Sequence, residues 1–150
     1  MHFPFSEISM AHLKRTVATL RIMGDDLRPD EITRMLGCEP TFSQIKGEEL
    51  IGRKTGFVRI AKFGMWQLQA TDREPGNLDE QIEELLDKLS GSVDNWNDIS
   101  NKFEIDLFCG LFLARSNEGL SISPKSLAAL GGRSIELDLD IYGSSDEEET

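Results

Sequence analysis

The stretch FEIDLFCGLFL, residues 103–113, has the cleanest two-residue alternation in the chain. Because successive side chains of a strand point to opposite faces, this period predicts a β-strand with one face in the core. Strands of a parallel doubly wound sheet are apolar on both faces, so the pattern favours an antiparallel or mixed sheet with one face in water. The predicted core face carries Phe103, Ile105, Leu107, Cys109, Leu111 and Leu113, and the outer face carries Glu104, Asp106, Phe108, Gly110 and Phe112.

Further strands follow from the same alternation elsewhere in the chain. They are expected at residues 15–22, 57–61, 65–70 and 135–142. The second and third of these are close enough to form a hairpin about Lys62-Phe63-Gly64. Residues 38–56 hold four Gly and Pro residues, so we expect an extended loop there.

Apolar stripes between cap residues predict the helices. They are expected at 29–36, between Asn77 and Gly91, and from Pro124 to Gly131, with a short helical turn at 93–100. The order predicts an α+β fold: a four- to five-stranded antiparallel or mixed sheet with two to three helices on one face. This is a ferredoxin-like (split βαβ) variant.

That architecture makes a prediction about charge. The first strand would lie between the last strand and the 103–113 strand, so Arg15 and Arg21 would reach the carboxylates of both. Opposite charges on neighbouring strands stabilise a sheet, and like charges destabilise it. The carboxylates concerned are Glu104, Asp106, Glu136, Asp138 and Asp140.

Length and composition indicate one domain. The chain has 150 residues, of which 39% are hydrophobic and 29% charged, as in ordinary globular proteins. We expect a loose N-terminal segment at 1–12, a single α+β domain at 13–142 and a disordered acidic tail at 143–150. Without an export signal, a membrane span or more than two cysteines, the chain is expected in the cytoplasm.

The net charge of -11 is unevenly distributed. Residues 1–62 hold ten Lys and Arg against eight Asp and Glu, whereas 63–150 hold six against nineteen. The acidic half repels phosphate backbones, so nucleic-acid binding is not expected, and a basic protein surface would be attracted. Acidity also keeps a protein soluble whatever its partners are.

The residues needed for common catalytic sites are scarce. The only histidines are His2 and His12, and Cys38 and Cys109 stand far apart in the sequence. A nucleophile needs a base held within hydrogen-bond reach, and zinc needs about four closely spaced ligands. We therefore predict no catalytic residue, no metal site and no cofactor. The carboxylates of 136–140 would bind a cation only if another strand added oxygens.

The segment 46–62 is the most basic part of this acidic chain, with a net charge of +3. Cations beside aromatic rings can bind an anionic ligand, and long irregular loops are often functional. The alternative is that the rings belong to the core and the cations are solvated. The candidate ligand-binding residues are Lys46, Arg53, Lys54, Arg59 and Trp66.

The outer face of the sheet is the second candidate site. Phe108 and Phe112 lie on it, and exposed apolar patches mark contact sites unless a loop or a second chain covers them. Asp138 and Asp140 add negative charge to the same face. These four residues are the candidate partner-binding residues, and the chain is expected to be a monomer or a weak homodimer.

An ordered set of short motifs resembles an uncharacterised bacterial family, domain-of-unknown-function 4279, over about residues 16–142. The motifs are Gly24-Asp25-Asp26-Leu27, Pro29-Asp30-Glu31-Ile32, Leu36-Gly37, Pro40-Thr41, Lys46-Gly47, Trp66, Leu78, Gly119 to Ser123, Leu127 to Gly131 and Asp140-Ile141-Tyr142. The resemblance implies a fold and a bacterial source, and it transfers no site residue. Arg28 departs from the family, whose members often carry a better helix cap before Pro29.

These observations lead to two main hypotheses, and an enzyme with carboxylate chemistry is a distant third. The first is a non-enzymatic protein-interaction module, an immunity- or antitoxin-like acidic binder of a basic partner, because acidic surfaces speed association with basic proteins. The second is a small anionic-ligand-binding or regulatory domain that uses the cationic 46–62 loop.

Overall fold

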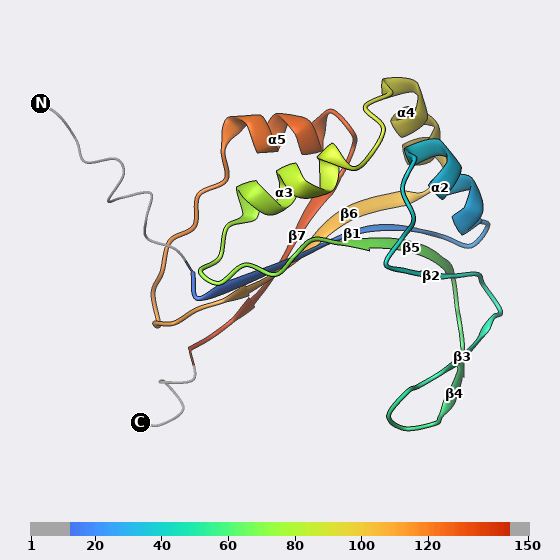
Figure 1. Ribbon diagram of the computed structural model, residues 1–150, viewed down its shortest axis with the longest axis horizontal. Helices are drawn as coiled ribbons and strands as arrows, with labels where there is room; N and C mark the ends of the chain where they lie inside the picture. Colours follow the sequence, from blue (N-terminus) through green and yellow to red (C-terminus); the bar gives the residue numbers. More distant parts are fainter. Residues whose placement is uncertain (1–12, 145–150) are drawn as a thin grey trace, which may run out of the picture.

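A computed structural model describes residues 13–144, in which one five-stranded sheet carries all the helices on one side (Figure 1). The strand order is β2-β5-β1-β6-β7, and a separate two-stranded sheet joins β3 and β4. The predicted loose segment 1–12 and residues 145–150 of the predicted tail lie outside the described residues. The strands are β1 (Arg15–Gly24), β2 (Phe42–Gln44), β3 (Glu49–Ile51), β4 (Val58–Ile60), β5 (Gly64–Gln69), β6 (Glu104–Phe112) and β7 (Glu136–Tyr142).

The first strand, β1, is the centre of the sheet. It pairs with β5 and β6, in both cases antiparallel, and β7 joins the outer edge of β6 in parallel. The α+β class and the mixed five-stranded sheet are therefore as predicted. The predicted place of β1 beside the last strand is wrong, because β6 separates the two. The ferredoxin-like variant is not confirmed by this topology.

Four helices cover one face of the sheet within residues 13–144, where two or three were predicted (Figure 1). They are α2 (Pro29–Leu36), α3 (Leu78–Asp87), α4 (Val93–Lys102) and α5 (Pro124–Gly131). The α2 helix has its predicted bounds, and its cap residue Arg28 makes no side-chain cap hydrogen bond. Asn77 caps α3 as predicted, since its side chain accepts from the Glu80 N–H at 3.1 Å.

The fourth helix, α4, is longer than the single turn expected at 93–100. The Ser92 hydroxyl caps it by accepting from the Asn95 N–H, which satisfies one of the free N–H groups of its first turn. Trp96 then anchors it in the core with 1% exposure, and its indole N–H donates to the Ser90 carbonyl at 2.7 Å. The helix has few apolar positions, which explains why the sequence pattern underestimated its length.

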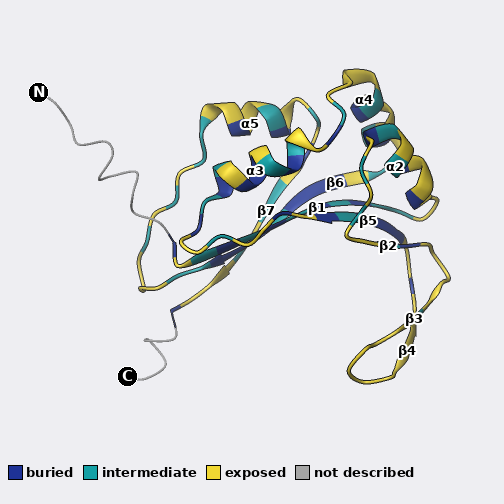
Figure 2. Cartoon of the chain, viewed as in Figure 1, coloured by how far each residue is buried: buried dark blue, intermediate teal, exposed yellow. Residues whose placement is uncertain are grey.

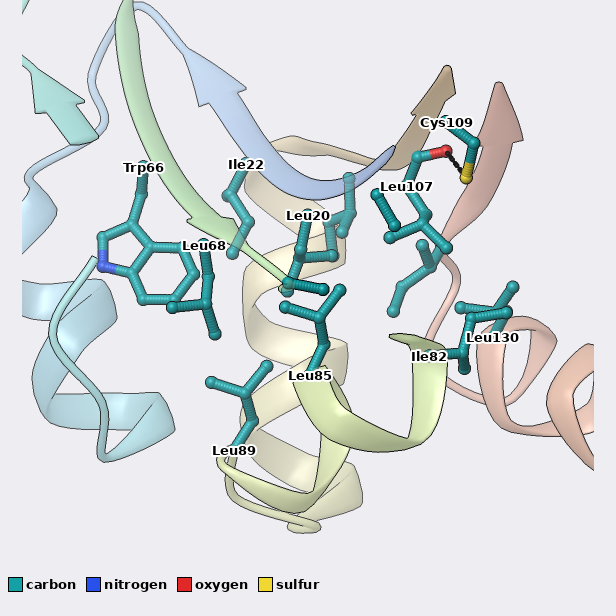
Figure 3. Packing of buried hydrophobic residues seen from close by; sticks show 14 of the residues in the cluster. Leu20, Ile22, Trp66, Leu68, Ile82, Leu85, Leu89, Leu107, Cys109 and Leu130 are labelled. Atoms are coloured by element: carbon teal, nitrogen blue, oxygen red, sulfur yellow. Dashed lines mark hydrogen bonds between the residues drawn. The ribbon is translucent and has the colours of Figure 1, made fainter. Parts of the chain in front are cut away.

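The core lies between the helices and the inner face of the sheet. Leu20 and Ile22 of β1 face Leu85 of α3, and Cys109 and Leu107 continue the layer on β6 (Figure 3). Figure 2 shows that the middle strands are the most buried part of the sheet. On β7 the inner face is only partly covered: Leu139 and Ile141 are 44% and 61% exposed, because the described helices do not extend over the end of this strand.

A buried polar cluster joins α3 to β1. Thr16 and Gln81 are both 0% exposed, and the Thr16 hydroxyl donates to the Gln81 side-chain oxygen at 2.7 Å. The Gln81 amide donates to the main-chain carbonyls of Thr16 and Thr71, and the Asn77 N–H donates to the Thr16 hydroxyl. These bonds fix the start of α3 over β1, because buried polar groups are costly unless they are paired.

The segment 38–70 differs most from the prediction. β4 does not pair with β5: it pairs with β3, and the extended loop expected at 38–56 contains β2 and β3. Gly64 explains part of the error, because it begins β5 rather than forming a turn. A Cβ there would lie 2.8 Å from the carbonyl oxygens of Gly24 and Leu27, so only glycine fits this close approach.

Candidate functional site

The sheet face opposite the helices carries charged and aromatic side chains on β1, β6 and β7. No described helix lies over it (Figure 1). Cross-strand register places alternate residues of the three strands on this side. We call it the open face and define it by Arg15, Arg21, Glu104, Asp106, Phe108, Phe112, Glu136, Asp138, Asp140 and Tyr142.

Arg21 and Asp106 form the centre of the open face. They are directly opposite in the β1–β6 register, and Arg21 Nε and Nη2 donate to the two carboxylate oxygens at 2.8 and 2.6 Å. The Asp106 side chain is only 7% exposed, so this bidentate pair neutralises a nearly buried charge. The hydrogen bonds to Asp106 raise the pKa of Arg21 although burial opposes them. The guanidinium carbon also lies 4.5 Å from the centre of the Phe108 ring.

Asp138 lies beside this pair on β7. Its Oδ2 is 3.9 Å from Arg21 Nη2, so Arg21 reaches carboxylates on two strands. The hydrogen bond with Asp106 raises the pKa of Asp138, with further contributions from burial and from the charges of Asp106 and Glu136. Carboxylates therefore outnumber cations here, and the excess negative charge faces solvent.

A second group of contacts lies toward the end of β6. The Phe112 and Tyr142 rings stack with centroids 4.6 Å apart and planes 7° from parallel. The Arg15 guanidinium lies 5.0 Å from the Phe112 centroid, and the Tyr142 hydroxyl donates to Asp140 at 2.7 Å. This hydrogen bond and the nearby charge raise the pKa of Tyr142. The two aromatic rings thus form an ordered platform between an arginine and a carboxylate.

The predicted role of the β1 arginines is right for Arg21 and wrong for Arg15. Arg15 forms its ion pairs with Asp72 and Glu74, which lie outside β6 and β7. The difference has a simple cause: Arg15 lies opposite Phe112 in the register, so it has a ring rather than a carboxylate as its neighbour. The open face as defined carries five carboxylates against two arginines, a net charge of -3.

The β3–β4 hairpin projects from the β2 edge of the sheet, on the side away from the helices (Figure 1). We call residues 45–62 the arm. Val58, Arg59 and Ile60 are all exposed, and Ile51 and Phe57 are 70% and 78% exposed (Figure 2). With these side chains exposed, the arm lacks the apolar contacts that usually support a hairpin. An isolated two-stranded hairpin is at best marginally stable in water.

The arm is also the basic part of the molecule. Its net charge is +3, from five cations and two glutamates. Lys46 at its base forms an ion pair with Asp25 at 3.2 Å. Within residues 13–144, the other four cations form no ion pair; they are Arg53, Lys54, Arg59 and Lys62.

A small groove lies where the arm meets the sheet. Its volume is about 280 Å³, and two cations and two rings line it together with four other side chains. These four residues are Phe42, Arg59, Lys62 and Phe63. Of the predicted ligand-binding residues, only Arg59 lies here, while Arg53 and Lys54 are near the tip of the arm.

Trp66 does not belong to this groove. It is 0% exposed on the inner face of β5, and its indole N–H donates to the Thr33 hydroxyl at 3.1 Å (Figure 3). The expected contact between Trp66 and a ligand at the arm is therefore corrected: the tryptophan is a core residue that holds α2 against the sheet.

Other groups of reactive side chains are few. The described part of the chain contains no group of three His, Cys, Asp or Glu placed to hold a metal ion. Both cysteines are free, and burial raises the pKa of the Cys109 thiol to about 12. A groove of about 880 Å³ lies between α2 and α4, with Asp25 and Asp26 among its lining residues. No helix in the described range combines the length and apolar content that a bilayer crossing requires.

Comparison with known families places this chain. The family model described as Domain of unknown function (DUF4279) matches residues 13–144. The chain belongs to this family. The match confirms the resemblance drawn from residues 16–142. Searches among curated proteins and among solved structures find no match.

The sequence pattern puts Arg21 and Tyr142 on the outer face of the sheet, but it does not indicate their contacts with aromatic rings. Tyr142 was placed at the end of a strand without a role, and Arg21 was treated as a counter-charge rather than as a ring contact. The alternation of β7 already put Tyr142 on the same face as Asp138 and Asp140. Its stacking partner, however, depends on β7 pairing with β6 in parallel, which alternation alone does not indicate.

Proposed function

We propose that this chain is a non-enzymatic protein-interaction module, and that its open face binds a basic protein in the manner of an immunity or antitoxin protein. The observation that carries the proposal is the uncovered face itself: carboxylates of two neighbouring strands surround the Phe112–Tyr142 platform, with a net charge of -3. Interfaces are enriched in tyrosine, phenylalanine and arginine, and a charged surround steers association with partners of opposite sign.

The predicted partner-binding residues fit this surface in different ways. Asp138 and Asp140 have partly exposed or exposed side chains beside the platform. Phe108 and Phe112 are partly buried, since Arg21 and Arg15 lie over their rings. A partner would therefore meet the arginines, Tyr142 and the carboxylates first, and the phenylalanines would support them from beneath.

The proposal also includes the cellular compartment, the source and the fold variant. Two cysteines that form no disulfide support a reducing cytoplasm. A bacterial source rests on the family resemblance drawn from the sequence. A ferredoxin-like variant stays within the proposal because β5 and β6 flank β1 and both run antiparallel to it.

Neutralising the open face should abolish most of the binding. We expect immobilised wild type to retain a basic protein from lysate of the source organism at low salt and to release it at moderate salt. The double variant Asp138→Asn/Asp140→Asn should bind that protein about tenfold more weakly, because exposed ion pairs contribute modestly but in the same direction.

The matched control is Glu83→Gln/Asp87→Asn, which removes the same charge from exposed positions of α3 on the opposite side of the molecule. It should bind like the wild type. Equal loss in both variants would mean that net charge, and not the open face, drives binding, and retention of no basic protein by the wild type would count against the proposed function.

A second candidate function rests on the groove at the base of the arm. Its volume of about 280 Å³ is near the lower limit for small-molecule sites, and Arg59 and Lys62 stand beside two rings there. Such a site suits a small anion with an apolar body, such as an aromatic carboxylate.

Thermal shift with benzoate and with inorganic phosphate tests the groove. If it binds benzoate, we expect the Tm to rise by about 3 °C at saturating ligand and less with phosphate, which offers the rings nothing to contact. Arg59→Ala should remove the shift and Arg53→Ala, which lies outside the groove, should keep it. An unchanged shift in Arg59→Ala would contradict this assignment.

A further inference from the structure

The arm and the open face are complementary within a single chain. The arm carries a net charge of +3 and exposes Ile51, Phe57, Val58 and Ile60, whereas the open face carries a net charge of -3 around an aromatic platform. We propose that the arm of one copy docks on the open face of a second copy, so that two chains form a reciprocal dimer. The inference rests on the proposed function because it assigns a partner, the chain itself, to the same face.

The arm needs such a partner more than any other described segment. It is a two-stranded sheet, and both of its faces are exposed: Ile51, Val58 and Ile60 lie on one, and Phe57 and Arg59 lie on the other. A hairpin gains stability from a third strand or from an apolar surface packed against it. Among residues 13–144, neither a third strand nor an apolar surface lies against the arm, apart from its base at the groove.

Its own open face does not supply that surface. The arm leaves the sheet at the β2 edge and projects away from the sheet (Figure 1), while the carboxylates of the open face lie on β6 and on β7, the opposite edge strand. Five strands at a spacing of about 4.8 Å separate these edges by about 19 Å. A hairpin with arms of about eight residues spans about 26 Å, so it can cross the open face of a second copy.

Two-fold symmetry makes the contact reciprocal. In a dimer of this kind each copy offers its arm and receives its partner's arm, so every arm–face contact occurs twice. The 18 residues of the arm and the ten of the open face together match the 20–30 residues a side, roughly, that stable interfaces use. In this dimer the arm of one copy covers the open face of the other. A foreign partner could therefore bind the open face only after it displaces the arm.

Charge reversal on either element separates this arrangement from other dimers. The arm variant Arg53→Glu/Arg59→Glu carries -1 on the arm, and the face variant Glu136→Lys/Asp140→Lys carries +1 on the open face. Sedimentation equilibrium of the full chain, over about 1 μM to 1 mM, measures self-association of each. We expect the wild type to dimerise at low salt, with each variant alone at least about tenfold weaker, because arm and face then carry the same sign.

The decisive sample is the equimolar mixture of the two variants. The reversed arm meets a reversed face, and the unchanged arm meets an unchanged face, so the mixture should regain the dimer that neither variant forms alone. A monomeric wild type throughout this range, a dimer that persists in both single-element variants, or a mixture that stays monomeric would each overturn the inference.

Failure of the self-association and failure of the proposed function give different results. A monomeric wild type that still retains a basic protein through Asp138 and Asp140 would remove the self-association and leave the interaction module in place. A dimer restored in the mixture, together with no retained protein, would leave the arm–face contact in place and remove the foreign partner.

Discussion

Replacing Arg21 with alanine is expected to lower the free energy of unfolding by about 2–3 kcal/mol. The substitution leaves Asp106, whose side chain is 7% exposed, without its bidentate partner and close to Asp138. Breaking a buried ion pair by removing one member is costly because the remaining charge stays buried. This value lies below the cost of about 3–5 kcal/mol that is usual for a fully buried pair, because the Arg21 side chain is itself 24% exposed to solvent. Urea unfolding followed by tryptophan fluorescence measures the change.

Two further variants test whether the unpaired carboxylate of Asp106 causes this loss of stability. Arg15→Ala removes an arginine of the same strand and face, but its partners Asp72 and Glu74 are solvent-accessible, so the unfolding free energy should change far less. Arg21→Met/Asp106→Leu should recover much of the loss, because a buried pair can often be exchanged for apolar side chains. If the double variant is as unstable as Arg21→Ala, the stranded carboxylate is not the reason.

Gln81→Met should cost about 3 kcal/mol of unfolding free energy. The side chain is 0% exposed and makes three hydrogen bonds, one with the Thr16 hydroxyl and two with the main-chain carbonyls of Thr16 and Thr71. Methionine has a similar shape but leaves these buried groups without a partner, and the interior offers no water to replace it. The loss should appear as a lower urea midpoint with an unchanged slope.

Gln69→Met is the matched control for this prediction. Gln69 is exposed at the end of β5, so the same exchange there should shift stability by less than about 0.5 kcal/mol. Similar losses at both positions would mean that the buried polar cluster does not hold α3 over β1.

The sequence predicts those features that depend on neighbouring residues alone, such as the ends of a helix and the two faces of a strand. Helix α2 has its predicted bounds because Pro29 and Gly37 act within one turn of its ends, and Gly37 takes the left-handed φ of 76° that ends it. The outer faces of β6 and β7 were also predicted, since alternation assigns each residue to a side whatever strand lies next to it. That is why Asp138, Asp140, Phe108 and Phe112 were candidates before the fold was known.

Strand partners could not be predicted in the same way. Val58 and Ile60 alternate as a strand should, but their alternation is the same whether they pair with β5 or with β3. The choice depends on the turn at 52–56, where Gly56 has a φ of 68° and the Gly52 N–H donates to the Phe57 carbonyl. Trp66 was misplaced for a related reason: the face of β5 that enters the core is set by its pairing with β1.

The central position of β1 has a consequence for how the chain folds. Its partners begin about 40 and 80 residues further along, and Thr16 pairs with Leu111 at the far end of the β1–β6 ladder. During synthesis β1, the middle strand of the sheet, is therefore made before β5 and β6. Its two edges can form their hydrogen bonds only after these two strands have been made. Long sequence separation between contacting residues slows folding, because a large loop must close before the contacts stabilise it. Both edges of this apolar strand are unpaired until β5 is made, and the second edge stays unpaired until β6 is made. Aggregation competes with folding at these stages.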